Sequence, residues 1–263
     1  MDLEVLVSTM NLEDNKKLVE SLNIKGKSLV INQCKQENKL EDITKGQNRL
    51  LNFLERGLSR SRNRALENAK ADICVIADDD MVYDDEYEKN ILEAHEKYPE
   101  ADIIAFYVID EDGTPRKKVR KEGKINLLTS LKLASVQLTF KRKRIIDSNV
   151  KFDEQFGAGA KLYMGEENIF LANCLKKKLK IYYVPKKIAM LKKCDSTWFE
   201  GYTDKFFEVK GTVFYKISKM FYPILILQFV LRKKKLYGKD NTPINALKCM
   251  FRGVKKYKKA NKK

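Results

Sequence analysis

The sequence has a single histidine and no closely spaced pair of cysteines. Each of these features excludes a class of site. The one histidine, His95, lies in the charged run EAHEKYPE, a setting typical of a hydrogen-bonded surface histidine. A Ser-His-Asp triad is therefore not expected. The cysteines are odd in number and scattered, without a CxxC pair: Cys34, Cys74, Cys174, Cys194 and Cys249. They predict reduced thiols in a cytosolic setting, not a disulfide framework or a zinc site.

Acidic residues are scarce near the C-terminus. The whole chain carries 53 Lys and Arg against 36 Asp and Glu, a formal net charge of +17. From Arg232 to Lys263 there are 13 basic residues and one acid, Asp240, so this segment carries +12 and the preceding 231 residues carry +5. Such a balance indicates an anionic partner. The 263 residues, of which 43% are apolar, suit one large domain with an appendage.

Signal-peptide and membrane-spanning features are also lacking. The N-terminal MDLEVLVSTMN has acids where a signal peptide has bases, so no signal peptide is expected. The apolar run from Met220 to Leu231 contains Pro223 and Gln228 and is shorter than the roughly 20 residues that cross a bilayer. Basic clusters, RKKK and KKYKKANKK, follow this run. This pattern favours a helix lying on an anionic membrane face; the alternative is a helix packed on the domain, with a solvated basic end.

Continuous apolar runs alternate with amphipathic stretches through the first 110 residues. The runs predict strands at 3–9, 27–33, 71–77 and 101–110, and the periodicity predicts helices at 12–22, 58–71 and 86–98. Strands without alternation are buried on both faces, as in a mostly parallel sheet covered by helices. Less regular elements are a short amphipathic piece at 46–57, an exposed loop at 111–123, strands at 131–140 and 180–185, and a helix at 168–178. The fold class is therefore α/β.

Three adjacent carboxylates, Asp78, Asp79 and Asp80, end the apolar strand ICVIA. Adjacent buried carboxylates repel each other unless a cation neutralises them. On an extended chain, Asp78 and Asp80 point to one side and Asp79 to the other. Mg2+ prefers one or two carboxylates together with phosphate oxygens. The block therefore predicts a metal that bridges the chain to a diphosphate; the alternative is a solvated loop whose acids cap the next helix.

The stretch GLSRSRN brings hydroxyls and cations to the start of the predicted helix at 58–71, where phosphate oxygens are readily bound. Arg62 falls on the same stripe as Leu58 and Ala65, so it is expected to face the sheet. An arginine in this position either binds a ligand or pairs with one of the aspartates.

The run GEENIF places Glu166 and Glu167 directly after Gly165 and before an apolar helix. Acids in a first helical turn are ordinary capping residues. The functional interpretation is a general base that deprotonates an attacking hydroxyl.

Taken in order, VSTMN, GLSRSRNRALENAKADICVIADDD and FDEQFGAGAKLYMGEENIFL resemble the family-2 glycosyltransferases with the glycosyltransferase-A fold, of the bacterial surface-polysaccharide type. The resemblance covers residues 1 to about 205; each motif is weak alone, and the ordered set is specific. It implies a catalytic domain at 1–205, with a mostly parallel central sheet and helices on both faces. Residues 206–263 would form a basic, aromatic, helical C-terminal extension that associates with a membrane.

The resemblance also implies roles for particular residues. Asp78 and Asp80 would form the DxD motif that holds Mn2+ or Mg2+ against the diphosphate of a nucleotide sugar. Glu167 matches the position of the catalytic base, with Glu166 beside it; because the family more often has Asp there, the assignment between the two is open. The residues implied to line the nucleotide-sugar site are Ser8, Thr9, Asn11, Gln33, Arg62, Asn63, Asp78 and Asp79.

Two further departures from the family pattern concern the nucleotide and the metal. The second strand ends in INQCKQE without the usual Asp, so Asn32 and Gln33 are expected to replace it as hydrogen-bonding groups. The late histidine that assists the metal in many members is missing from IAMLKKCDSTW. Asp195 or Ser196 would take its place.

The implied activity is that of an inverting, metal-dependent glycosyltransferase using a nucleoside-diphosphate sugar, with UDP as the expected nucleotide. The acceptor would be a hydroxyl of a glycan or a lipid-linked molecule, in the biosynthesis of a surface polysaccharide such as a capsule. The expected location is cytoplasmic, peripheral at the inner face of the plasma membrane. The aromatic segment 196–211 is either a flap on the acceptor side or ordinary packing.

Two other function classes share features with this sequence. A basic nucleic-acid-binding protein agrees with the net charge, but the charge lies in one tail and no nucleic-acid motif occurs, so no nucleic-acid partner is expected. Another nucleotide-dependent transferase, such as a nucleotidyltransferase, usually has a glycine-rich phosphate loop after its first strand. VSTMNLED contains no glycine.

Overall fold

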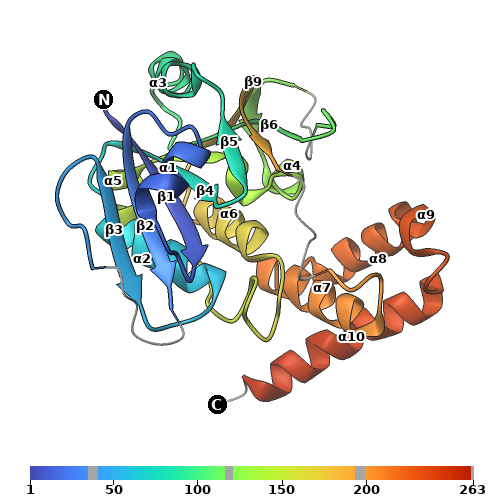
Figure 1. Cartoon of the computed structure of the whole chain (residues 1–263). Helices are drawn as coiled ribbons and strands as arrows, with labels where there is room; N and C mark the ends of the chain where they lie inside the picture. Colours follow the sequence, from blue (N-terminus) through green and yellow to red (C-terminus); the bar gives the residue numbers. More distant parts are fainter. Residues whose placement is uncertain (35–40, 116–120, 193–198, 262–263) are drawn as a thin grey trace.

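One central sheet with helices on both faces forms the body of the molecule (Figure 1). The computed structural model describes residues 1–34, 41–115, 121–192 and 199–261. Within these ranges the strands are β1 (Leu3–Met10), β2 (Lys27–Gln33), β3 (Asn48–Phe53), β4 (Ile73–Asp78), β5 (Met81–Tyr83), β6 (Ile103–Asp110), β7 (Gly123–Ile125), β8 (Leu138–Lys141) and β9 (Ile181–Leu191). Their order across the sheet is β3-β2-β1-β4-β8-β6-β9-β5, and β7 pairs with β9.

The sheet is parallel in one half and mixed in the other. Strands β3, β2, β1 and β4 pair in parallel, so their carboxyl ends meet at one edge, where open α/β sheets bind ligands. In the other half, β8 runs antiparallel to β4 and β6, and β5 and β7 run antiparallel to β9. The mostly parallel arrangement expected from the sequence therefore holds in the half that carries the strand-end aspartates.

Alternate side chains of each central strand enter two separate cores, as the period of two in a strand requires. On β1, Val5 and Val7 pack into one core with residues of α1 and α3, whereas Leu6 packs into the other with residues of α2, α5 and α6. The helices of this part are α1 (Asn15–Ser21), α2 (Leu58–Asn68), α3 (Tyr87–Lys97), α4 (Leu127–Ser130), α5 (Arg142–Ser148) and α6 (Glu166–Lys176).

Several local expectations were wrong in detail. The amphipathic piece at 46–57 contains the edge strand β3. In the expected strand 131–140, the Gln137 side chain donates to the Phe106 carbonyl and accepts from the Ala134 N–H. These bonds hold a 3₁₀ turn, Ser135–Gln137, so that strand β8 begins only at Leu138.

His95 is buried rather than on the surface, and its Nε2 lies 2.9 Å from Thr139 Oγ1. Burial lowers the pKa of His95 to about 3. This histidine is therefore a neutral core residue.

Four C-terminal helices form a separate layer beside the sheet, coloured orange to red in Figure 1. They are α7 (Asp204–Ile217), α8 (Tyr222–Arg232), α9 (Lys234–Tyr237) and α10 (Pro243–Ala260). Their apolar faces share a core with Phe156, Met164 and Ile169 of the sheet part. None of the helices in the described ranges is long and apolar enough to cross a membrane.

Helices α7 and α10 cross at unusually short range because each presents a glycine. A Cβ atom on Gly253 would lie 2.0 Å from the Glu208 carbonyl oxygen, and one on Gly211 would lie 2.3 Å from the Met250 carbonyl oxygen. Since both obstacles are backbone atoms, a side chain at either position would force the helices apart.

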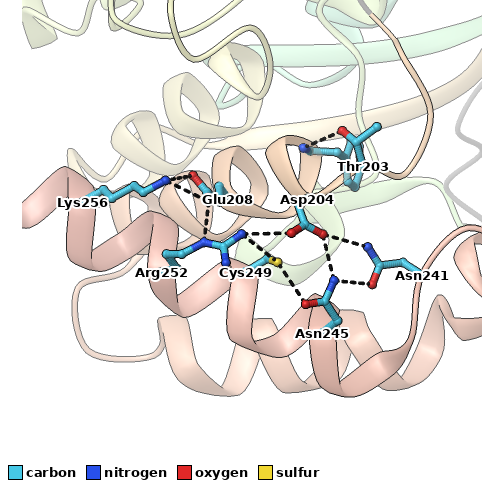
Figure 2. Close-up of polar contacts among 9 residues, drawn as sticks. Thr203, Asp204, Glu208, Asn241, Asn245, Cys249, Arg252 and Lys256 are labelled. Carbon is cyan, nitrogen blue, oxygen red and sulfur yellow. Dashed lines mark hydrogen bonds and ion pairs between the residues drawn. The ribbon is translucent and has the colours of Figure 1, made fainter.

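Polar contacts beside this crossing join α10 to the start of α7 (Figure 2). Arg252 donates to Glu208 Oε1 at 2.6 Å and to Asp204 Oδ2 at 3.1 Å, and Lys256 Nζ lies 2.8 Å from Glu208 Oε2. Asn245 also donates to Asp204 Oδ1. Part of the positive charge of the tail therefore fastens it to α7, while other cations of the tail are directed outward.

Candidate active site

The start of helix α2 is fastened to the glycine-rich loop at 156–159. Gly57 has a φ of 126°, a backbone conformation that favours glycine. Directly after it, Leu58 N donates to Ala158 O at 2.9 Å, and Ser59 Oγ donates to Phe156 O at 2.6 Å. This docking fixes the first turn of α2 and therefore the position of Arg62 one turn further on.

Arg62 is the centre of a buried polar network. Its side chain is 2% exposed. The Nη2 atom donates to Asp78 Oδ1 and to Ser135 Oγ, each at 2.9 Å, and Nη1 donates to Glu166 Oε1 at 2.9 Å. The expected orientation of Arg62 toward the sheet is correct, and the structure pairs it with an aspartate and a glutamate. One guanidinium therefore joins the end of β4, the turn before β8 and the start of α6.

The charges in this network are unequal. Burial raises the pKa of Glu166 to about 7, and the nearby Glu167 carboxylate adds to the rise, while Arg62 opposes it. Burial lowers the pKa of Arg62, but the attraction of Asp78, and then of Glu166, outweighs this and the pKa is raised. Because Asp78 attracts the Arg62 guanidinium most strongly, the Arg62–Asp78 contact is the principal ion pair of this network, and Glu166 beside it has a pKa that burial raises to about 7.

Glu166 and Glu167 are held at the start of α6 by an unusual glycine. Gly165 has a φ of 85°, and a Cβ there would lie 2.6 Å from a methyl carbon of Val213 on α7. The glycine thus lets α6 begin against α7. Glu166 is buried in its contact with Arg62, whereas Glu167 is half-buried and, like Glu166, lines a cavity.

This cavity, of about 920 Å³, lies between the sheet part and the C-terminal helices. The sheet part contributes a cluster of polar side chains, set among apolar ones such as Leu128, Leu131 and Val136: Arg62, Asp78, Lys132, Ser135, Glu166 and Glu167. The opposite wall combines aromatic, apolar and basic side chains: Phe199, Tyr202, Phe206, Lys210, Phe214, Leu225, Gln228, Phe229, Arg232, Lys233 and Leu236. A substrate in the cavity would therefore contact carboxylates on one side and rings and cations on the other.

The three aspartates do not continue as an extended strand. Strand β4 ends at Asp78, and Asp79 and Asp80 form a turn into β5. Side chains alternate between the two faces only within a strand, and β4 ends at Asp78. The expectation that strand geometry places Asp78 and Asp80 on one side is therefore wrong. Asp78 lines the cavity and contacts Arg62, while Asp79 Oδ2 accepts from Thr9 Oγ1 at 2.6 Å. The Asp80 carbonyl accepts from Lys192 N, and its side chain is partly buried.

The other predicted nucleotide-sugar residues lie near the carboxyl ends of β1 and β2 or along α2. Ser61 Oγ donates to Ser8 Oγ at 2.9 Å, which joins α2 to β1. Asn11 has a φ of 51°, and its Oδ1 accepts from Arg56. Asn63 contacts Phe152 through both ends of its amide, so it fastens a loop and is not among the residues that line the cavity.

The second strand ends in two buried amides. Asn32 Oδ1 accepts from the Leu12 N–H, and its Nδ2 donates to Asn52 Oδ1, so this side chain is used within the fold. Gln33 is buried, and its Oε1 has no hydrogen-bond partner among the described residues. Of the two expected replacements for the missing Asp, Gln33 therefore retains an acceptor for a ligand.

Oxygen ligands for a cation are limited in the part of the chain that the structure describes. It contains no group of three or more His, Cys, Asp or Glu side chains placed to hold a metal. Asp195 and Ser196, expected to replace the late histidine, lie outside the described residues. Asp78 and Asp80 alone are a donor set that suits a hard cation whose other ligands are substrate oxygens and water.

Several functional candidates carried no signal in the sequence. Ser135, which accepts from Arg62, lies in a segment expected to be a strand. Lys210 and Arg232 belong to the C-terminal helices, yet they line the same cavity as Asp78. Only the packing of α7 and α8 on the sheet part brings these cations to the site.

Comparison with known proteins identifies the family. The profile described as Glycosyl transferase family 2 matches residues 29–163, more than half of the chain. No curated protein sequence matches.

Similar solved structures include S. aureus TarS 1-349 in complex with UDP-GlcNAc, with a TM-score of 0.66 and 16% identity, covering 97% of this chain and 82% of that chain. TarS 1-349 without a named ligand gives a TM-score of 0.65, and its complex with UDP gives 0.64, both at 16% identity, covering 99% of this chain and 83% of those chains. At this identity the likeness shows the fold, which is that of the glycosyltransferase-A type. The chain belongs to glycosyltransferase family 2, and it is a glycosyltransferase with a mixed α/β sheet of the glycosyltransferase-A type.

Proposed function

We propose that this nucleotide-sugar glycosyltransferase is inverting and metal-dependent, and that it uses a UDP-sugar. The acceptor is a hydroxyl of a glycan or of a lipid-linked molecule, in the biosynthesis of a cell-surface polysaccharide such as a capsule. The observation that carries the proposal is the wall of the cavity where Arg62 joins Asp78 to Glu166, with Glu167 beside them. This wall combines a strand-end carboxylate with a second carboxylate that is positioned to accept a proton.

Glu167 is the catalytic base in this proposal. Glu166 is buried and bound to Arg62, and burial raises its pKa to about 7, so it positions the network. Glu167 lies next to it, is half-buried and lines the cavity. The acceptor oxygen attacks the anomeric carbon, the bond from that carbon to the nucleoside diphosphate breaks, and the hydroxyl proton passes to Glu167. One displacement of this kind inverts the anomeric configuration.

The nucleotide lies at the carboxyl ends of β1 and β2. This is the ligand-binding edge of an α/β sheet, and it carries Ser8, Thr9, Asn11 and Gln33. The buried Gln33 Oε1 supplies an acceptor for an N–H of the nucleotide base. The choice of UDP is supported by the structurally similar TarS, which was solved in complex with UDP-GlcNAc and with UDP.

The proposed cation, Mn2+ or Mg2+, is held by Asp78 and Asp80. When bound, it neutralises charge on the leaving diphosphate. Because these two side chains are few ligands for a hard cation, we expect tight metal binding only together with the donor. Arg62 holds Asp78 in place through the hydrogen bond from its Nη2 to Asp78 Oδ1.

The acceptor enters against the aromatic wall. Phe199, Tyr202 and Phe206 contact one another edge to face, with ring centroids 5.1 to 5.8 Å apart, and all three line the cavity. Ligand cavities of this kind bind through apolar and aromatic faces and are oriented by a few polar groups. The segment 196–211 is therefore proposed as the acceptor side; residues 196–198 of it lie outside the described ranges.

The proposed location is the cytoplasm, peripheral to the inner face of the plasma membrane. Among the described residues, Cys34, Cys74, Cys174 and Cys249 are free thiols and buried, which agrees with a reducing compartment.

The experiment that tests the donor site is calorimetric titration of the protein with UDP-, GDP- and dTDP-sugars, in Mn2+ and in EDTA. Binding of one donor that requires the metal and is lost in Asp80→Ala is the expected result. Asp85→Asn is the matched control, because this acid lies just after β5 and contacts Asn23 and Lys25 instead of the cavity. Donor binding that persists in EDTA and in Asp80→Ala would contradict the proposed metal site.

A further inference from the structure

Helix α8 exposes an apolar stripe that the fold does not use. Met220, Ile224, Leu227 and Leu231 are 72%, 65%, 50% and 65% exposed. The spacing of three and four residues places Ile224, Leu227 and Leu231 on one side of α8, and Met220 lies in the turn just before this helix. The opposite side, with Leu225, Ile226 and Val230, is buried in the C-terminal core. Packing in the core therefore accounts for the buried apolar residues of α8 but not for the exposed ones.

Cations lie at both ends of this stripe. Lys219 precedes it, and Lys233, Lys234 and Lys235 follow it, all of them exposed. None of these four forms an ion pair with another described residue, in contrast to Arg252 and Lys256, which are paired to α7 (Figure 2). Apolar side chains flanked by free cations match the anionic headgroups and acyl chains at a bilayer surface.

We propose that the stripe formed by Met220, Ile224, Leu227 and Leu231 of the α8 region docks on an anionic lipid bilayer, with α8 lying in the interface. A second copy of this chain is a poorer occupant of the same face. Each copy carries a net charge of +17, and two copies would bring their basic ends together, where like charges repel. A bilayer containing anionic lipid instead supplies the opposite charge over the whole face.

The docking face borders the mouth of the cavity. Gln228 and Arg232 line the cavity, and they directly follow Leu227 and Leu231 in the chain, about 100° further round the helix. Both residues are exposed as well as cavity-lining, so a bilayer on the stripe lies beside this rim of the cavity. This step rests on the proposed function: an acceptor anchored in the bilayer would reach Glu167 without leaving the membrane surface.

Vesicle sedimentation tests the docking face directly. The purified full chain is mixed with vesicles of phosphatidylcholine alone or of phosphatidylcholine with phosphatidylglycerol, without any donor. We expect binding to the anionic vesicles, weakening as salt is raised, and little binding to the neutral ones. Replacing two apolar side chains with Ile224→Gln/Leu231→Gln should weaken binding to anionic vesicles about 10-fold.

A matched control is Leu54→Gln/Ile146→Gln, which changes two exposed apolar residues, at 67% and 49% exposure, away from α8. It should bind like the unchanged protein. A second variant, Lys234→Glu/Lys235→Glu, leaves the stripe intact and should lose the preference for anionic vesicles. Circular dichroism checks that each variant is folded.

The proposal is overturned if the unchanged protein does not bind anionic vesicles, or if the α8 variant binds them equally well. It is also overturned if light scattering finds a dimer that the α8 variant converts to a monomer, since the stripe would then be covered by a second copy. Because the donor titration is done without lipid and vesicle binding without donor, failure of one proposal leaves the other standing.

Discussion

Arg62 and Asp78 are joined by a 2.9 Å contact between Nη2 and Oδ1 at the point where β4 ends. The arginine is 2% exposed and the aspartate 30%, so the pair spans the boundary between the core and the cavity. A cation on the core side therefore holds a carboxylate at the wall of the cavity. The same guanidinium reaches Glu166, which explains how one side chain positions groups from two distant segments.

Replacement of Arg62 should therefore be costly. In Arg62→Ala, Asp78 and Glu166 face each other without their shared cation, and we expect a loss of about 3 kcal/mol in the free energy of unfolding. Urea denaturation measures this loss. The control is Arg60→Ala on the same helix, which contacts Glu154 with both side chains 48% exposed and should change stability by less than about 1 kcal/mol. Equal losses in the two variants would contradict a central role for Arg62.

Glu166 should make stability depend on pH. Its pKa rises from 4.5 to about 7 in the folded chain because of burial, so between these values the folded state holds a proton that the unfolded state has lost. The stabilisation is complete below pH 4.5 and disappears as pH rises through 7. Relative to Glu166→Gln, the unchanged protein should lose on the order of 2 kcal/mol between pH 5 and 8. If the free energies of unfolding of the two proteins change with pH in the same way over that range, Glu166 is ionised throughout.

Glu167 should control the rate more than the affinity. Glu167→Gln removes the proposed proton acceptor while keeping the shape of the side chain, so kcat should fall about 10²- to 10⁴-fold. Donor affinity by calorimetry should stay nearly unchanged. A comparable fall in Glu154→Gln, an acid outside the cavity that contacts Arg60 and Asn63, would indicate a general structural effect instead. Activity retained in Glu167→Gln would assign the base elsewhere.

The α7–α10 crossing should not tolerate a methyl group. In Gly253→Ala the new Cβ meets the Glu208 backbone oxygen at 2.0 Å, and forced separation of packed helices typically costs about 1–3 kcal/mol. Gly26→Ala is a useful comparison, because its Cβ meets only the end of the Glu88 side chain, which can rotate away. Thermal unfolding of both variants measures the difference. If Gly253→Ala is as stable as Gly26→Ala, the close approach of the helices is not required.

The docking face adds a functional expectation of its own. If the acceptor is anchored in lipid, Ile224→Gln/Leu231→Gln should lower activity on an acceptor presented in vesicles while leaving donor binding in solution unchanged. The measurement compares transfer to the same acceptor in anionic vesicles and in detergent. An equal fall in both settings would place the effect in the cavity, not at the membrane.

The sequence by itself determined the elements whose signal is local. β2 has the bounds expected from its apolar run, and α2 begins at Leu58, where periodicity placed it; α6 begins at Glu166, two residues before the expected helix at 168–178. It also determined the inward orientation of Arg62, because helical periodicity is a property of neighbouring residues. The family follows from short motifs in a set order, which do not require knowledge of the packing.

Tertiary structure alone decided which groups meet. Arg62 and Glu166 are 104 residues apart, and no local pattern records that contact. The turn at Asp79 and Asp80, the 3₁₀ turn that presents Ser135, and the second wall of the cavity also depend on long-range pairing and helix packing. The physical reason is that periodicity shows which face of an element is apolar, whereas the partner of that face is selected by the packing of the whole chain.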